Sequence, residues 1–336
     1  MRKLFFISIV AAALVFWSER SSAQAVESDQ WAATDGLGRA LPGREQTRAR
    51  RDNRKVAMFY WTWHTSPITD YRRIGNITQI LREHPEAIDD YDHPAWDIGG
   101  NSYFWDEPLL GYYKTTDPWV LRKHAEMLAD AGVDVVFFDC TNASFTWKSS
   151  YDVLIDVWTE AQGDGVNVPK IAFMLPFGPV DWSLVSLRQL YEDIYKPGRA
   201  ENLWFYLHGK PCIMAYPDNL TDSPKDKAIA VFFTFRPPQA GYYTDGPIAT
   251  RYDEWSWLQI YPQHGFAKKA DGTFEQISVG VAQNTSPDKK GRCGAFNVKD
   301  AYGRNFSVLK GFDPRVDGYL YGWNFQEQWN RALELD

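Results

Sequence analysis

The chain has 336 residues, a net charge of −7 and an aromatic content of 16%, with 15 Trp, 18 Tyr and 20 Phe. The acidic balance argues against a general nucleic-acid binder, and beyond the N-terminal segment no apolar run approaches the roughly 18 residues of a membrane span. A chain of this length can bury one large core, and a (β/α)8 barrel of about 250 residues is one of the few single domains of that size.

The N-terminal segment has the pattern of a secretory signal peptide. Two basic residues precede an apolar run from Leu4 to Trp17, and a small-residue cleavage site ends at Ala25. We therefore expect residues 1–25 to be removed and the mature protein to be secreted or periplasmic. Residues 26–54 are then a lead-in, and residues 55–336 form the catalytic barrel domain.

The three cysteines, Cys140, Cys212 and Cys293, are odd in number and scattered. A disulfide framework is therefore not expected even in an oxidising compartment, and at most one bridge can form within the chain.

The first predicted strand runs from Val56 to Trp63 and ends at His64. In an extended strand Trp61 and Trp63 share one face, while Tyr60 and His64 share the other. We expect one set to line the barrel interior and these four residues to contact substrate. For His64, a hydrogen bond to a sugar hydroxyl is favoured over a role as general base or metal ligand, since no nearby Cys or His spacing resembles a metal site.

A long connection carries the acidic pair Asp106 and Glu107. Long loops in compact domains are usually functional, and adjacent acids of an extended segment point to opposite sides. We expect one of the two to face substrate as a catalytic carboxylate. Pairing with a nearby Lys or Arg is the structural alternative.

A well-marked helix follows this connection. Asp117 can cap it, Pro118 suits its first position, and Gly132 suits the left-handed turn that ends it. The next strand, Val133 to Phe138, is apolar enough to be covered on both faces.

Asp139 directly follows this second predicted strand. In (β/α) barrels the active site lies at this C-terminal end of the parallel strands. Burying a carboxylate after so apolar a run is costly unless it faces a cavity with partners, and Asn142 is the predicted partner. We expect Asp139 to be catalytic and Asn142 to bind substrate. The alternative for Asp139 is a cap of the following loop.

Five further apolar runs complete a series of seven predicted strands. They are 171–175, the pair 203–207 and 212–216 around a hairpin-like turn, 231–235, 257–261 and 277–282. Two helices are also predicted, one capped by Asp181 and one at the C-terminal end with an apolar face of Phe325, Trp329, Ala332 and Leu333.

Polar and aromatic residues near the ends of the last strands are predicted to bind substrate. They are Arg236, Glu254, Trp257, His264, Gln283 and Asn284. The guanidinium of Arg236 could recognise a uronate carboxylate, with a structural salt bridge as the alternative.

Four segments resemble secreted glycoside-hydrolase barrels of families 71 and 99. They are Met58 to His64, Tyr103 to Pro108, the strand ending at Asp139, and Asn324 to Trp329. The resemblance covers roughly residues 55–336 and implies a (β/α)8 TIM-type barrel. In these families the strand after the last helix ends in a Trp-Asn-Glu-Trp-like motif with an essential carboxylate. Since the sequence ends at Asp336 before such a motif, the expectation is a barrel without its eighth strand and with one carboxylate beyond Asp336.

Glycoside hydrolysis normally uses two carboxyl groups on either side of the scissile bond. The expected function is therefore a secreted glycosidase of an oligosaccharide or polysaccharide, without cofactor, metal, nucleic acid or obligate protein partner. The alternatives are a glycan-binding barrel that does not hydrolyse its ligand, and a lyase of acidic glycans with Arg236 as neutraliser and His64 as base. Nucleophile-elbow and dinucleotide motifs are absent from the sequence, which disfavours acyl and hydride transfer.

Overall fold

The computed structural model describes the chain in segments. These are residues 32–34, 38, 40–43, 45–47, 51–64, 75–90, 92–97, 103–104, 108–111, 113–239, 253–257, 263, 265–280, 282–283, 294–295 and 323–336. The predicted signal peptide lies outside them. The chain divides into two compact units, Met1–Arg51 and Asp52–Asp336, and in the first an antiparallel bridge joins Thr34 to Ala40.

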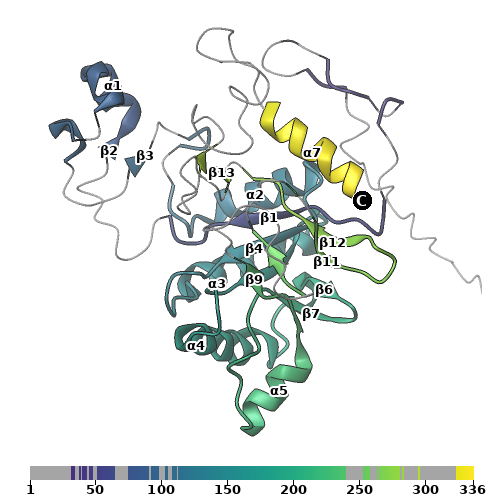
Figure 1. Ribbon diagram of the computed structural model, residues 1–336. Helices are drawn as coiled ribbons and strands as arrows, with labels where there is room; N and C mark the ends of the chain where they lie inside the picture. The colour runs from purple at the N-terminus through teal and green to yellow at the C-terminus, as the bar shows by residue number, and fades with distance from the viewer. Residues whose placement is uncertain are drawn as a thin grey trace, which may run out of the picture. The chain divides into compact units, whose positions relative to one another are not determined.

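The second unit contains a series of parallel strands in chain order (Figure 1). β1 (Ala57–Tyr60), β4 (Val135–Asp139) and β5 (Lys170–Met174) form one sheet. A parallel bridge from Met174 to Met214 continues it to β7 (Lys210–Ile213), which pairs with β8 (Thr234–Phe235). The same segment runs on into β9 (Pro238–Gln239), which pairs with β10 (Trp255–Ser256).

Helices connect these strands. They are α2 (Pro118–Asp130), α3 (Lys148–Gly163), α4 (Asp181–Leu190) with its π-helical continuation η5 (Tyr191–Tyr195), and α5 (Pro224–Phe232). The predicted cap of α2 is confirmed, because the Asp117 carboxylate accepts hydrogen bonds from the amides of Trp119 and Val120, and Gly132 has a φ of 81°. For α4 the cap position is Val180, and Asp181 is the first helical residue.

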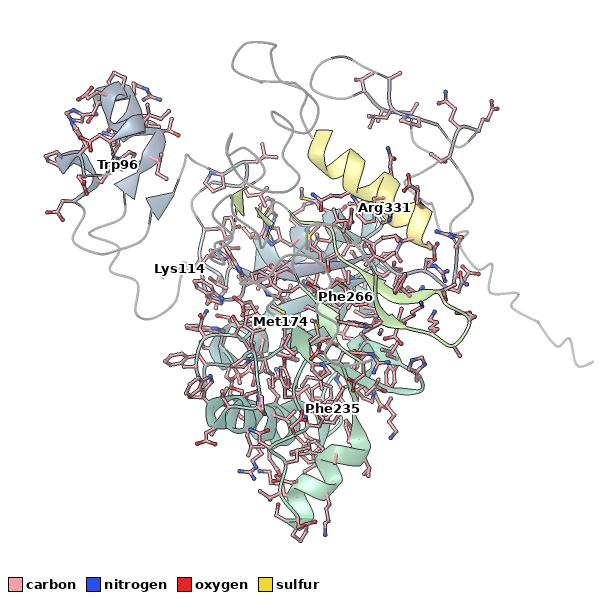
Figure 2. The ribbon with its side chains drawn as sticks, in the orientation of Figure 1. Trp96, Lys114, Met174, Phe235, Phe266 and Arg331 are labelled. Atoms are coloured by element: carbon pink, nitrogen blue, oxygen red, sulfur yellow. The ribbon has the colours of Figure 1, made fainter. Side chains whose placement is uncertain are left out.

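The two faces of the sheet bury different side chains. The outer face packs on the helices through a cluster that includes Phe138 and Phe173, with Trp158 of α3 donating its indole N–H to the Leu121 carbonyl at 2.9 Å. The inner face has its own cluster. It consists of Val135, Phe137, Ala172, Met174, Cys212, Met214 and Trp255, with Phe59 and Trp257 packed against it. Figure 2 shows Met174 amid the side chains of this unit.

Contacts across the inner face show that the sheet is curled. Phe59 on β1 stacks on Trp257, just after β10, with ring centroids 5.7 Å apart. In a flat sheet these two strands would lie five strand spacings, roughly 24 Å, apart. A barrel is built by curling a sheet until one of its faces is enclosed and its helices lie outside. Among the described residues, the strands do not close into a ring.

Three predicted strands differ from those observed. Val231 and Phe232 belong to α5, because the Ser223 hydroxyl caps a helix that continues through the apolar run. Trp257 follows β10 instead of beginning a strand. Ile277 ends β12 (Phe274–Ile277), the antiparallel partner of β11 (Gly265–Lys268).

The predicted hairpin before the fourth barrel strand is confirmed, since β6 (Tyr206–Leu207) pairs antiparallel with β7. The remaining elements are β2 (Gly75–Asn76), α1 (Ile77–Glu83), η3 (Pro85–Asp89), η4 (Pro94–Trp96), β3 (Tyr103–Phe104), η6 (Glu201–Leu203), β13 (Ala282–Gln283) and β14 (Gly294–Ala295).

The C-terminal helix is α7 (Trp323–Leu335). Of its side chains from residue 328 onward, which the structure describes, Gln328 is buried and bonds the N–H and the carbonyl of Gly280, while Trp329 and Leu333 are 46% and 62% exposed. The predicted C-terminal helix is thus confirmed, and two residues of its predicted apolar face are exposed. Among the described residues, none of the helices has both the length and the apolar content needed to cross a membrane.

Candidate functional site

Asp139 is the last residue of β4 and is only 3% exposed. Its Oδ2 accepts a hydrogen bond from the Trp63 indole at 3.0 Å, and its Oδ1 accepts from the Thr141 amide at 3.0 Å and the Thr141 hydroxyl at 2.7 Å. Alternation along β4 puts Asp139 on the inner face with Val135 and Phe137. A carboxylate with three donors is therefore held at the C-terminal end of the sheet.

The contacts of Thr141 are those of a loop cap, the structural alternative for Asp139. Asn142, the predicted partner, is exposed, and in the described residues the donors to Asp139 are Trp63 and Thr141. The prediction of Asn142 as the partner was wrong because Thr141, two residues after Asp139, bonds to the carboxylate and closes the turn.

An aromatic row passes this carboxylate. Trp63 lies 5.4 Å from Trp61 on one side and stacks on Trp147 at 5.9 Å on the other, and Trp147 stacks on Phe145 at 5.2 Å. Trp61 also packs edge-on against Phe59 at 6.0 Å, which links the row to the stack of the inner face. Trp61 and Phe145 are each 52% exposed. The row therefore offers aromatic surface to solvent beside Asp139.

The loop after β4 brings Trp147 to this row. Ala143 and Trp147 have left-handed backbones, with φ of 53° and 57°, and the buried Cys140 thiol donates to the Thr146 carbonyl at 3.5 Å. Left-handed conformations are uncommon for residues other than glycine and cluster at functional sites. Burial, followed by the charge of Asp139, raises the pKa of Cys140, which keeps this thiol protonated and unreactive.

Tyr60 lies on the other face of the sheet from this row. Its hydroxyl is 2.8 Å from Nδ1 of His124, and its ring contacts Phe138 and Trp158 of the outer cluster. Burial, and secondarily Tyr113, raises its pKa. In the described residues Tyr60 is thus packed among protein groups and is not brought together with Asp139.

His64 packs edge-on against Tyr113 at 5.2 Å, and Tyr113 contacts His124 at 5.7 Å. Partial burial of the ring, followed by the charge of His124, lowers the pKa of His64. The imidazole is therefore neutral at pH 7, which suits hydrogen bonding to a hydroxyl. Its role in substrate binding stays a prediction.

Arg236 forms the salt bridge given as its structural alternative. Its Nε and Nη2 donate to Glu275 at 2.5 and 2.9 Å, and Glu275 also accepts from the Trp255 indole at 2.8 Å and lies 3.0 Å from His208. Burial opposes ionisation of Glu275, but these hydrogen bonds outweigh it and lower its pKa. The Arg236 charge is thus already balanced within the protein.

The other predicted site residues fall into two groups. Trp257 is in the inner-face stack, between Phe59 and Phe177, which lies 5.8 Å away, whereas Glu254 is buried directly before β10. The second group lies outside the described residues, or in the case of Gln283 is described only as strand backbone. It comprises Asp106, Glu107, His264, Gln283 and Asn284.

Thr141, Phe145 and Trp147 were not predicted as site residues. Their signal is their position in the loop directly after the strand that ends at Asp139, since loops at this end of a parallel strand form the active site in barrels. Phe59 was likewise included in the first strand without a role.

No family model and no curated protein matches the chain. Among the solved structures that are similar to part of it are two of the GH99 endo-α-mannosidase from Bacteroides thetaiotaomicron. The first, in complex with BIS-TRIS-propane, has 21% sequence identity and a TM-score of 0.30 over 40% of this chain and 43% of its own. The second has 23% identity and a TM-score of 0.29 over 40% of each chain.

The structure comparison thus finds one of the two glycoside-hydrolase families that the sequence motifs resemble. The chain spans about two fifths of the length of these structures. At such TM-scores the likeness carries no argument about activity.

Proposed function

We propose that the chain is an exported glycoside hydrolase in which Asp139 acts at the scissile bond. The observation that carries this proposal is the inner-face carboxylate of Asp139 at the C-terminal end of a parallel strand, bonded to the Trp63 indole within an aromatic row. Export is proposed from the pattern of residues 1–25 alone.

The hydrogen bonds of Asp139 suit one half of a carboxylate pair. Trp63 and Thr141 both donate to it, so the carboxyl group acts as an acceptor, as an ionised carboxylate does. An ionised carboxylate serves as nucleophile, as general base or as stabiliser of the oxocarbenium-like transition state. The general acid is then a second carboxyl group, for which Asp106 or Glu107 is the proposed residue.

Trp61 and Phe145 are the proposed sugar contacts of the row. Aromatic rings combine a large apolar face with polar edges, and a sugar ring presents C–H groups that pack on such a face. Trp61 and Phe145 are the rings of the row with the most exposure, whereas the faces of Trp63 and Trp147 are turned to one another.

The lyase alternative loses support from Arg236. A lyase needs a cation to neutralise the uronate carboxylate, but this guanidinium is held by Glu275. A glycan-binding protein without hydrolysis shares the aromatic row and differs from a hydrolase in turnover alone.

Release of reducing ends from a broad panel of plant, algal and microbial glycans tests the proposal. The unmodified protein is expected to release them, and Asp139→Asn is expected to lower the rate about 10²–10⁴-fold with the shape of the protein retained. Asp164→Asn is the matched control, because this carboxylate is 54% exposed and pairs with Arg122 on the surface.

Binding without turnover on every glycan of the panel would favour the glycan-binding protein. Unsaturated products that absorb in the ultraviolet would favour a lyase. Full activity of Asp139→Asn would remove Asp139 from the reaction.

A further inference from the structure

Three potential metal ligands meet in the short segment after α1. His84 ends this helix and begins η3, Glu86 lies in the first turn of η3, and His93 precedes η4. One ligand atom from each residue lies within 4.8 Å of the other two. Figure 2 shows the side chains of this segment around Trp96.

The spacing of these atoms fits a tetrahedral metal ion. Oε1 of Glu86 is 3.3 Å from Nδ1 of His84 and 3.3 Å from Nε2 of His93. Zinc with bonds of about 2.0–2.2 Å keeps neighbouring ligand atoms roughly 3.3–3.6 Å apart. Hydrogen bonds between ionised partners are shorter, at about 2.7–2.9 Å. Two edges of the tetrahedron are therefore already formed.

The backbone that carries the ligands is held in place by protein contacts. The Trp96 indole donates to the carbonyls of Ala87 and Asp90, at 3.1 and 2.9 Å, and so closes the loop between η3 and η4. Contacts of this kind, formed before a ligand arrives, lower the cost of binding.

The exposure of the ligands also suits a metal. The side chains of His84 and Glu86 are 47% and 60% exposed, so they can move and a water molecule can reach the fourth position.

Metal binding would change the tautomer of His93. Its Nδ1 accepts a hydrogen bond from the Ala95 amide at 3.2 Å, so the neutral ring carries its proton on Nε2, directed at Glu86. Coordination through Nε2 moves that proton to Nδ1 and breaks the contact with Ala95. The loss of one long hydrogen bond is small beside the free energy of zinc coordination.

We propose that His84, Glu86 and His93 form a binding site for a divalent metal ion of the zinc type. The donor set of two imidazoles and one carboxylate is favoured by zinc, copper(II) and nickel(II) over magnesium or calcium, which take oxygen ligands. The site departs from the sequence-based expectation of no metal ligand. It is independent of the proposed hydrolase activity.

Calorimetric titration of the full-length chain with zinc, after removal of metals with EDTA, tests the site. One zinc ion is expected to bind, and His84→Gln, Glu86→Gln and His93→Gln are each expected to weaken binding by at least about 10-fold. His208→Gln is the matched control and should bind as the unmodified chain does. This 62% exposed histidine also pairs with a carboxylate, but no third ligand joins the pair within the part of the chain that the structure describes.

Nitrogen-15 NMR of the imidazoles gives a second readout. Without metal the His93 proton is expected on Nε2, and with zinc on Nδ1. The proposal is wrong if no saturable binding occurs at equimolar zinc. It is equally wrong if the three variants titrate as the unmodified chain does, or if zinc leaves the His93 tautomer unchanged.

Discussion

Trp63 connects the two halves of the candidate site at the scale of single residues. Its indole N–H is bonded to Asp139, and its ring is stacked on Trp147. The same side chain thus satisfies the buried carboxylate and builds the aromatic row. A buried charge that loses a donor is costly, since hydrogen bonds to charged groups contribute about 1.5–3 kcal/mol.

Trp63→Phe separates these two contributions, because phenylalanine keeps an aromatic ring and lacks the N–H. We expect the free energy of unfolding to fall by about 1.5–3 kcal/mol, as measured by urea denaturation. Trp61→Phe is the matched control with an expected loss below about 1 kcal/mol, since Trp61 is 52% exposed. Equal losses in the two variants would show that the bond to Asp139 contributes nothing.

Which residues surround Asp139 was only partly predictable. The position of Asp139 and the shared face of Trp61 and Trp63 follow from strand alternation, which the sequence displays directly. Thr141 and Trp147 do not, because their positions depend on a loop with left-handed residues at Ala143 and Trp147. Neither is a glycine, so the sequence gives no local signal for that turn.

At the scale of elements, α4 and α5 are joined by an ion pair in which the carboxylate is buried and the arginine is partly exposed. Arg188 on α4 donates from Nε and Nη2 to the Asp226 carboxylate on α5, at 2.8 and 2.6 Å. The amide and hydroxyl of Thr221 also donate to Asp226, at 2.8 and 2.6 Å. The hydrogen bond from Arg188 lowers the pKa of Asp226 far below its ordinary value and outweighs burial, which raises it. The hydrogen bonds from Thr221 lower this pKa further.

This pair predicts a loss of stability in acid. Because the folded protein keeps Asp226 ionised where the unfolded chain protonates it, the unfolded chain binds more protons as the pH falls below about 4, and stability decreases. Asp226→Asn is expected to cost about 1.5–3 kcal/mol at pH 7 and to show a shallower decline of stability below pH 4.

Unfolding followed by circular dichroism between pH 2 and 7 measures both effects. Asp222→Asn is the matched control, since this side chain is fully exposed and pairs with Lys227 at 3.2 Å. It should follow the unmodified chain at every pH. Parallel curves for Asp226→Asn and the unmodified chain would contradict the assignment to Asp226.

The elements themselves were predictable where their end signals are strong. The cap of α2 at Asp117 and the strand before Asp139 were found for this reason. α5 was mistaken for a strand in its last turn, because Val231 and Phe232 favour strands intrinsically. The N-cap at Ser223 starts a helix that includes Val231 and Phe232. Because Ser223 lies well before these two residues, the apolar run alone does not reveal the helix.

For the whole molecule, the decisive property is the curl of the parallel sheet. Hydrophobic runs predict that strands are buried on both faces, but they do not say which strand ends meet across the inner face. That information comes from contacts distant in sequence, such as Phe59 with Trp257 and Trp257 with Phe177. Trp257 therefore joins the first, third and last parallel strands of the described series.

A double-mutant cycle of Phe59→Leu and Trp257→Leu tests this curl. If the two rings stack as observed, the coupling energy from urea unfolding should be about 0.5–1.5 kcal/mol. The control cycle pairs Phe59 with Phe232 of the outer cluster, and these losses should add within about 0.3–0.5 kcal/mol. A flat sheet would keep β1 and β10 too far apart to interact, so additive losses for Phe59 and Trp257 would reject the curl of the sheet.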